Sequence, residues 1–214
     1  MTAEPHVLVM AKAPVPGRVK TRLCPPCTPR EAAALAEAAL ADTLEAVAGS
    51  GAGRRIVALD GRPGPWLPSG FTVVPQVAGG LDRRLAAAWT AAGGPGVQIG
   101  MDTPQVTPEL LDHALATLDT AGAALGRAVD GGWWAVALRR PDPRAFLGVP
   151  MSTSATGAAQ HARLRLLGLD VADLPPLVDL DTVAELPEVT AGGRAIRTAE
   201  LARRLGVLPV AASA

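Results

Sequence analysis

The first candidate for chemistry is Asp102, which follows a short apolar run at residues 97–100 and precedes Pro104. Proline cannot donate a hydrogen bond to a neighbouring strand, so the apolar run is typical of a strand that ends beside this aspartate. Ligands of open α/β sheets bind at the carboxyl ends of the strands, where an ionised carboxylate must face water, a cation or a metal ion. We therefore expect Asp102 at a ligand site, the alternative being a turn-capping role in its Asp-Thr-Pro sequence.

A basic loop follows the first apolar run of the chain. Lys12, Arg18, Lys20 and Arg22 lie within eleven residues, and Gly17 lies among them. Lysine offers a point charge, arginine a planar fork, and the loop amides beside Gly17 offer further donors, all of which suit phosphate oxygens. The loop contains neither a Walker sequence nor a dinucleotide fingerprint. It predicts a phosphate site of another type, the alternative being a solvated basic loop.

A second acidic segment, Asp130-Gly131-Gly132, is followed directly by Trp133 and Trp134. The glycines allow a ligand or a backbone to approach closely, and the carboxylate suits hydrogen bonds from sugar hydroxyls. An Asp-Gly hairpin turn explains the same residues equally well. Successive side chains of a strand point to opposite faces, so we expect Trp133 to line a pocket and Trp134 to enter the core.

The third acidic segment is Asp179-Leu180-Asp181, followed by Thr182 and Glu185. Thr182 and Glu185 have the spacing of a capping box, which places Asp181 just before the N-terminus of a helix. A carboxylate in that position can cap the helix or bind a metal ion. The sequence leaves both roles open.

Cys24 and Cys27 are the only cysteines, and they form a Cys-Pro-Pro-Cys sequence. A redox pair or half of a zinc site would have this spacing. However, there is no second cysteine pair, and His6, His113 and His161 are scattered along the chain. The motif also does not open a helix directly after a strand, so neither chemistry is expected there.

Short apolar runs that alternate with longer helix-like stretches must position these groups. The runs predict strands at residues 6–10, 55–59, 71–74, 97–100, 123–128, 133–138 and 171–174. Thr28 with Glu31 and Thr107 with Pro108 mark two helix starts. The alternation predicts an α/β fold with a mixed, mainly parallel sheet of about seven strands and helices on both faces. The short connection between the fifth and sixth runs predicts an antiparallel pair there.

Composition limits the partners. The chain has 214 residues, 49% of them hydrophobic, and its 20 basic and 20 acidic residues cancel. Zero net charge provides no field for nucleic acid or an anionic membrane, so we expect small-molecule partners. No apolar run approaches the roughly 20 residues of a membrane span, and the N-terminus lacks the features of a signal peptide, which predicts a cytoplasmic protein. We expect one domain over residues 1–206 and a poorly ordered tail at 207–214.

Five motifs occur in an order that resembles the bacterial DUF2064 family. They are Ala11-Lys12-Ala13-Pro14-x-Pro16-Gly17-x-x-Lys20-Thr21-Arg22-Leu23, Gly100-x-Asp102-x-Pro104, Asp130-Gly131-Gly132, Ser152-Thr153 and Asp179-x-Asp181-Thr182. The resemblance covers roughly residues 6–190. It implies the GT-A fold, a Rossmann-like three-layer fold of the nucleotide-diphospho-sugar transferase superfamily, often labelled glycosyltransferase. The chain is similar, more distantly, to the guanylyltransferase of coenzyme F420 biosynthesis.

The resemblance implies a metal-dependent transferase that uses a nucleotide or nucleotide-sugar donor and a small-molecule acceptor. Asp102 and Asp181 would hold Mg²⁺ or Mn²⁺, and the basic loop with Gly17 would bind the donor phosphates. The catalytic residues would be Lys20, Asp102 and Asp130. The acceptor would lie against Asp130, Gly131, Gly132, Trp133, Ser152 and Thr153.

Which group moves depends on the donor. Four loop cations suit a triphosphate and slightly favour nucleotidyl transfer to a phosphorylated small molecule. Glycosyl transfer from a nucleotide sugar and an inactive nucleotide-binding module are the alternatives. Compared with the family pattern, this chain has Met101 and Thr103 around Asp102, Trp133 in place of tyrosine and Met151 in place of tryptophan. The carboxylates are kept, so these changes affect the expected acceptor and not the expected metal.

Overall fold

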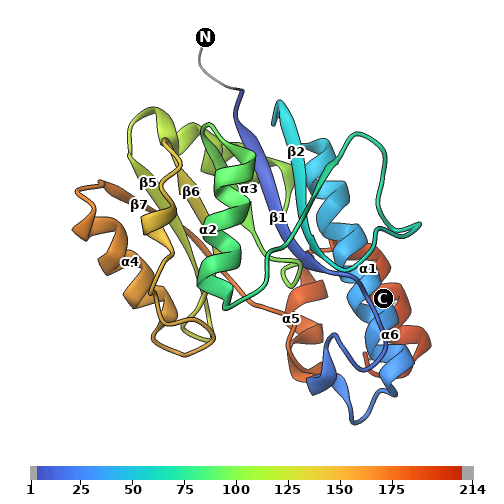
Figure 1. Cartoon of the computed structure of the whole chain (residues 1–214). Coiled ribbons are helices and arrows are strands. Elements are labelled where there is room, and N and C mark those ends of the chain that lie inside the picture. Colours follow the sequence, from blue (N-terminus) through green and yellow to red (C-terminus); the bar gives the residue numbers. More distant parts are fainter. Residues whose placement is uncertain (1–3, 209–214) are drawn as a thin grey trace.

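Seven strands form one sheet in the part of the chain that the computed structural model describes, residues 4–208 (Figure 1). They are β1 (His6–Lys12), β2 (Arg54–Asp60), β3 (Thr72–Pro75), β4 (Gly96–Ile99), β5 (Ala123–Ala128), β6 (Trp133–Leu138) and β7 (Val171–Leu177). Their order across the sheet is β3-β2-β1-β4-β6-β5-β7. Neighbouring strands are parallel except at β6, which is antiparallel to β4 and β5. The predicted mixed sheet and its antiparallel pair are confirmed.

The helices are α1 (Pro29–Gly49), α2 (Leu81–Ala92), α3 (Pro108–Ala116), α4 (Thr156–Leu166), α5 (Leu186–Ala191) and α6 (Ile196–Arg204). The helix starts predicted at Thr28 and Thr107 are confirmed. Thr28 and Glu31 form a capping box ahead of α1, and the Thr107 hydroxyl accepts a hydrogen bond from the Leu110 amide at the start of α3. Both helices have proline in their first turn, where a missing amide hydrogen costs no helical bond.

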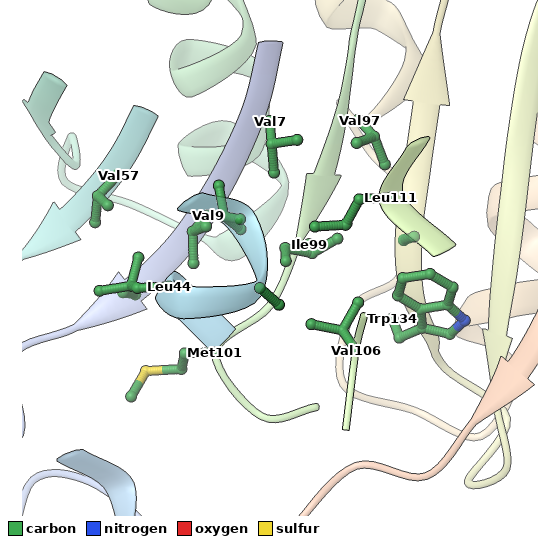
Figure 2. Packing of buried hydrophobic residues seen from close by; sticks show 14 of the residues in the cluster. Val7, Val9, Leu44, Val57, Val97, Ile99, Met101, Val106, Leu111 and Trp134 are labelled. Atoms are coloured by element: carbon green, nitrogen blue, oxygen red, sulfur yellow. The ribbon is translucent and has the colours of Figure 1, made fainter. Parts of the chain in front are cut away.

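Helices cover both faces of the sheet. On one face, the side chains of Val9 and Ile99 lie near Leu44 of α1 and Leu111 of α3 (Figure 2). On the other face, buried residues of α2 and α4 pack against the strands. A third cluster joins the outer side of α1 to α5 and α6, and Figure 1 shows α6 alongside α1. These layers confirm the three-layer fold.

The order of the strands creates a switch point between β1 and β4. The chain moves from β1 outward to β2 and β3 and then returns to place β4 on the other side of β1. Connections on the two sides diverge at such a point and leave a crevice beyond the carboxyl ends of the strands. The carboxyl ends of β5 and β7 reach the same edge, and so does the amino end of the antiparallel β6. This edge therefore collects the loops that follow β1, β4, β5 and β7.

The end of the described chain is packed. Leu208 is buried against the third cluster, and its amide donates to the Ala202 carbonyl. The tail expected from Val207 thus begins with residues that contact the core, and residues 209–214 lie outside the described residues. Among the described helices, none has the length and apolar character needed to cross a membrane.

Candidate functional site

Lys20 lies between two aspartates that come from different strand ends. Its Nζ is 2.6 Å from Asp102 Oδ1 and 3.3 Å from Asp181 Oδ1. Burial by itself lowers the pKa of the Lys20 ammonium, but the two carboxylates outweigh burial and hold that pKa above its ordinary value. Arg22 bonds the other oxygen of Asp181 at 3.0 Å. Residues far apart in the sequence therefore meet in one charged cluster.

Buried neighbours position Lys20. Val19 packs into the cluster beneath α1, and Leu23 packs into the cluster with α5 and α6. Lys20 itself has φ 47° and ψ 40°, a left-handed conformation that is uncommon for a residue with a side chain. Strained conformations of this kind persist where the surroundings fix them, often at functional sites. Cys24 and Cys27 follow in the same loop as free thiols.

The segment around Asp181 is joined to the Asp102 turn through the backbone. The amide of Leu180 donates to the Asp102 carbonyl at 2.8 Å, and the Gln105 side chain donates to the Val178 carbonyl at 2.6 Å. Thr182 and Glu185 form the predicted capping box, here on a short 3₁₀ helix. Asp181 thus faces Lys20 and Arg22, while Thr182 caps the helix.

Asp179 also lines the crevice; the sequence analysis placed it in an acidic motif but gave it no role. Burial, followed by repulsion from Asp102 and Asp130, raises the pKa of Asp179 to about 7. Asp181 adds to this repulsion, and Lys20 partly offsets it. Perturbed pKa values of this size concentrate at functional sites. The available signal was its place two residues before Asp181, but its burial depends on where β7 lies in the sheet.

The Asp130-Gly131-Gly132 turn, which also contributes to the crevice, packs on the start of α4. The Gly157 amide donates to the Gly131 carbonyl at 2.8 Å. A side chain on Gly131, which has φ 91°, would come within 2.1 Å of the Ser154 carbonyl oxygen, so only glycine fits there. Asp130 Oδ1 accepts the Gly132 amide, which leaves its other oxygen available.

The two tryptophans lie on opposite faces of the sheet, as predicted. Trp134 is 1% exposed, and its indole nitrogen donates to the Pro175 carbonyl at 2.9 Å. Trp133 is half-buried, packs near the Phe146 ring at 6.5 Å and lines the crevice. Trp134 also borders the crevice, so the expectation that only Trp133 would line it was wrong. Trp133 thus contributes both to the core and to the wall of the site.

The crevice is a cavity of about 840 Å³, within the range of small-molecule sites. Most of the predicted site residues line it: Lys12, Arg18, Lys20, Arg22, Asp102, Asp130, Gly132, Trp133, Ser152, Thr153 and Asp181. A smaller hollow of about 440 Å³ lies beside Lys12 and Arg18. Gly17 and Gly131 do not line either space. Gly17 instead has φ 76° in the loop, and Gly131 supports the turn.

Sequence reasoning also missed a polar group on the β2–β3 side of the cavity. The Gln76 side chain donates to the carbonyls of Ala11 and Ala58, both at 2.9 Å. Arg84 of α2 pairs with Asp60 at 3.1 Å. Gln76 and Arg84 both line the cavity. No short motif marked them, because their proximity to the basic loop depends on the strand order.

Asp102 and Asp181 fit a divalent ion. Their Oδ1 atoms both approach the Lys20 Nζ, so two carboxylate oxygens surround one cation position. Mg²⁺ prefers oxygen ligands and is usually held by one or two carboxylates together with substrate phosphates, and carboxylates also suit Mn²⁺. Residues 4–208 hold no cluster of three or more His, Cys, Asp or Glu side chains placed to bind a metal. An ion at this position would take its remaining ligands from phosphate and water.

Comparisons with known proteins agree with this architecture. The model of a family described as an uncharacterized protein conserved in bacteria, DUF2064, matches residues 32–153. No curated protein matches the chain. A provisionally assigned nucleotide-diphospho-sugar transferase from Desulfovibrio desulfuricans G20 is similar with a TM-score of 0.79 and 25% identity, over 95% of this chain and 98% of that one.

Two more distant structures share the fold alone. Rv0371c from Mycobacterium tuberculosis H37Rv, solved with manganese, has a TM-score of 0.51 and 18% identity over 89% of this chain and 100% of its own. A CMP:2-keto-3-deoxy-manno-octonic acid synthetase solved with CTP has a TM-score of 0.56 and 13% identity over 92% and 100%. The fold is that of nucleotide-diphospho-sugar transferases and nucleotidyltransferases.

Proposed function

The chain belongs to the bacterial DUF2064 family, and from that premise we propose that it is a metal-dependent transferase with a nucleotide donor. The main support is the convergence of Asp102 and Asp181 on one cation position beside the basic loop. Bound manganese in Rv0371c and bound CTP in the synthetase occur in proteins of the same fold. A divalent ion held by these carboxylates would neutralise phosphate oxygens and make the phosphorus a better electrophile.

The protein's own residues divide the cavity into a donor side and an acceptor side. Lys12 and Arg18 are exposed and make no ion pair within residues 4–208, so their charges are available to donor phosphates. Asp130 also lines the cavity, and its oxygen that does not accept the Gly132 amide can orient an acceptor hydroxyl or take its proton. Transfer of this kind depends on positioning and charge stabilisation more than on covalent chemistry by the protein.

Nucleotidyl transfer is the first candidate reaction. The cavity is lined by the four loop cations and by Arg84, together with four aspartates. With a divalent ion held by the carboxylates, these cations would suit a triphosphate better than a diphosphate. An acceptor oxygen would attack the α-phosphorus, the bond from that phosphorus to the bridging oxygen would break, and pyrophosphate would leave. The acceptor proton would pass to Asp130.

Glycosyl transfer is a second candidate, and the acceptor wall favours it. The residues Asp130, Trp133, Ser152 and Thr153 of that wall bring a carboxylate and hydroxyls, with no lysine or arginine among them. Such a wall suits a neutral hydroxyl acceptor better than a phosphorylated one. In this reaction the acceptor oxygen would bond to the anomeric carbon, the bond from that carbon to the diphosphate oxygen would break, and a nucleoside diphosphate would leave. The acceptor proton would pass to Asp130.

Product analysis separates the candidates. The protein is incubated with Mn²⁺, a panel of nucleoside triphosphates and nucleotide sugars, and acceptors that include polyols and sugar phosphates. Pyrophosphate release supports nucleotidyl transfer, whereas nucleoside diphosphate release from a nucleotide sugar supports glycosyl transfer. Binding of a donor without turnover in any combination would favour an inactive nucleotide-binding module.

The metal role is tested by Asp102→Ala. Loss of this carboxylate should lower turnover by about two to three orders of magnitude, because it removes charge stabilisation in the transition state. Folding should be retained, since the Asp102 side chain is 42% exposed and the buried Lys20 ammonium keeps Asp181 as a partner. Asp173→Ala, at an exposed position of β7, is the matched control. Unchanged turnover in Asp102→Ala would refute the metal role.

A further inference from the structure

We propose that the Lys20 ammonium occupies the metal position between Asp102 and Asp181 when no metal is bound, and that it must leave these two carboxylates before a divalent ion can bind. The inference rests on the proposed metal-dependent function and concerns how the same site is filled. Lysine and metal would then exchange at one point. The ammonium released from Asp102 and Asp181 would become available to the donor phosphates.

The geometry makes the two cations competitors. The Lys20 Nζ contacts one oxygen of each carboxylate, at 2.6 and 3.3 Å. Magnesium binds carboxylate oxygens at about 2.0–2.1 Å, so an ion bridging the same two oxygens would take the space of the ammonium. Two positive charges at such a short separation also repel strongly. Both cannot occupy the position at once.

Lys20 competes more effectively than the neighbouring arginine. Its side chain is 7% exposed, whereas that of Arg22 is 75% exposed. Arg22 bonds the other oxygen of Asp181, from the solvent side, and leaves the point between the carboxylates free. Exposed ion pairs contribute little to binding, but a pair with one buried partner is screened much less by salt. The charge that competes with the metal ion is therefore that of Lys20.

The loop allows the ammonium to move while the backbone stays in place. Val19 and Leu23 are buried on either side of Lys20, and the Leu23 amide donates to the Lys20 carbonyl at 3.0 Å. The four-carbon lysine side chain is flexible, so it can turn without displacing these anchors. Lys20 lies in the same loop as Lys12 and Arg18, which face the cavity without a carboxylate partner in the described residues. A donor phosphate bound there offers the ammonium a new anion.

The exchange predicts that metal and donor assist each other. Without donor, an incoming ion must displace the ammonium and leave it poorly paired. With donor phosphates present, the displaced ammonium finds new oxygen partners, so both ligands bind more tightly together than separately. Coupling between sites is typically in the range of about 5- to 150-fold.

Manganese binding to the donor-free protein tests the inference. Electron paramagnetic resonance reports free Mn²⁺ during titration of the wild type, Lys20→Met and the control Lys12→Met. Lys20→Met should bind one Mn²⁺ at least about tenfold more tightly than the wild type, because the competing charge is gone. Lys12→Met removes the same charge from the same cavity wall and should stay within about threefold of the wild type. Adding Asp181→Asn to Lys20→Met should abolish the gain.

Equal or weaker manganese binding by Lys20→Met would overturn the exchange, and so would an equal gain in Lys12→Met. Lys20→Gln, checked by thermal unfolding, replaces Lys20→Met if the apolar side chain prevents folding. These outcomes differ from failure of the proposed function, which is read from Asp102→Ala. If Asp102→Ala loses manganese-dependent turnover but Lys20→Met gains no affinity, only the exchange is wrong.

Discussion

At the scale of single residues, the raised pKa of the Asp179 carboxyl makes the stability of the protein depend on pH. The pKa of about 7 has burial as the largest cause, followed by repulsion from Asp102 and Asp130. The folded protein therefore binds a proton at Asp179 more tightly than the unfolded chain, in which the pKa is near 3.8. The stability that comes from this proton is fully present below pH 4 and is lost as the pH rises through about 7.

Asp179→Asn should remove this pH dependence. In chelator at pH 8, we expect the variant to be more stable than the wild type by about 2 kcal/mol, because the buried ionised carboxylate is gone. Near pH 4, where Asp179 is protonated in the folded wild type, the difference should be small. Urea unfolding across pH 4–8 measures both values. Asp173→Asn on the same strand is exposed and serves as the control; a variant less stable than the wild type at pH 8 would contradict the argument.

At the scale of elements, strand β6 assigns different roles to its first two residues. Trp134 is fully buried, and its indole nitrogen satisfies the Pro175 carbonyl of β7. Trp133 lines the cavity and packs near Phe146. Alternation along the strand predicted from the sequence alone that the two rings lie on opposite faces, but not that Trp134 would also border the cavity.

Alanine substitutions should separate the two roles. Trp134→Ala leaves a large cavity and an unpaired carbonyl, and should cost about 3–5 kcal/mol of unfolding free energy. Trp133→Ala should cost clearly less and mainly raise the KM for the acceptor. Denaturant unfolding and steady-state kinetics with a fixed donor are the measurements. If Trp133→Ala unfolds the protein while Trp134→Ala remains stable, the strand faces are assigned wrongly.

Strand β1 contains a second titrating group, far from the site chemistry. His6 is fully buried next to Trp89, at 5.1 Å between ring centroids. Burial and, secondarily, the charge of Arg54 lower the pKa of His6 from 6.5 to about 4. The neutral ring contributes stability that is present above pH 6.5 and lost as the pH falls through 4.

His6→Leu should flatten the acid side of the stability profile. Between pH 6.5 and 4, the unfolding free energy of the wild type should fall by on the order of 2 kcal/mol that the variant does not lose. Only the wild type has a histidine at this position, and its unfolded chain takes up a proton that it must release on folding. The informative quantity is the slope of the unfolding free energy against pH, because repacking around the leucine also changes the absolute stability. Denaturant unfolding at several pH values measures the slope. His113→Gln, at an exposed position of α3, should keep the wild-type slope.

Sequence reasoning located the strands well but could not place them side by side. Each apolar run became a strand, and β7 extended from Leu174 to Leu177. Pro175 and Pro176 are tolerated because β7 is an edge strand and because its pairing with β5 shifts register at these two residues. The burial of Asp179 depends on β7 pairing with β5. Such pairings are long-range, and no local pattern encodes them.

At the scale of the whole molecule, the site lies where the two parts of the sheet diverge. Lys12 is the last residue of β1, Asp102 follows β4, and Asp181 follows β7 at the far edge of the sheet. Within residues 4–208, the side-chain contacts between Asp181 and the basic loop are those of Lys20 and Arg22. A ligand that bridges the basic loop and the carboxylates therefore stabilises contacts between distant segments of the chain.

Thermal unfolding should reveal this bridging. With Mn²⁺ present and a matching nucleotide at about 100 times its Kd, the unfolding free energy should rise by roughly 2.7 kcal/mol, since the nucleotide binds the folded state and not the unfolded chain. Because the ion and the phosphates complete each other's ligand shells, the shift in Tm with both present should exceed the sum of the separate shifts. Scanning fluorimetry with each nucleoside triphosphate and nucleotide sugar measures it, and Asp102→Ala should lose the excess. An equal nucleotide shift in chelator would show that donor binding needs no metal.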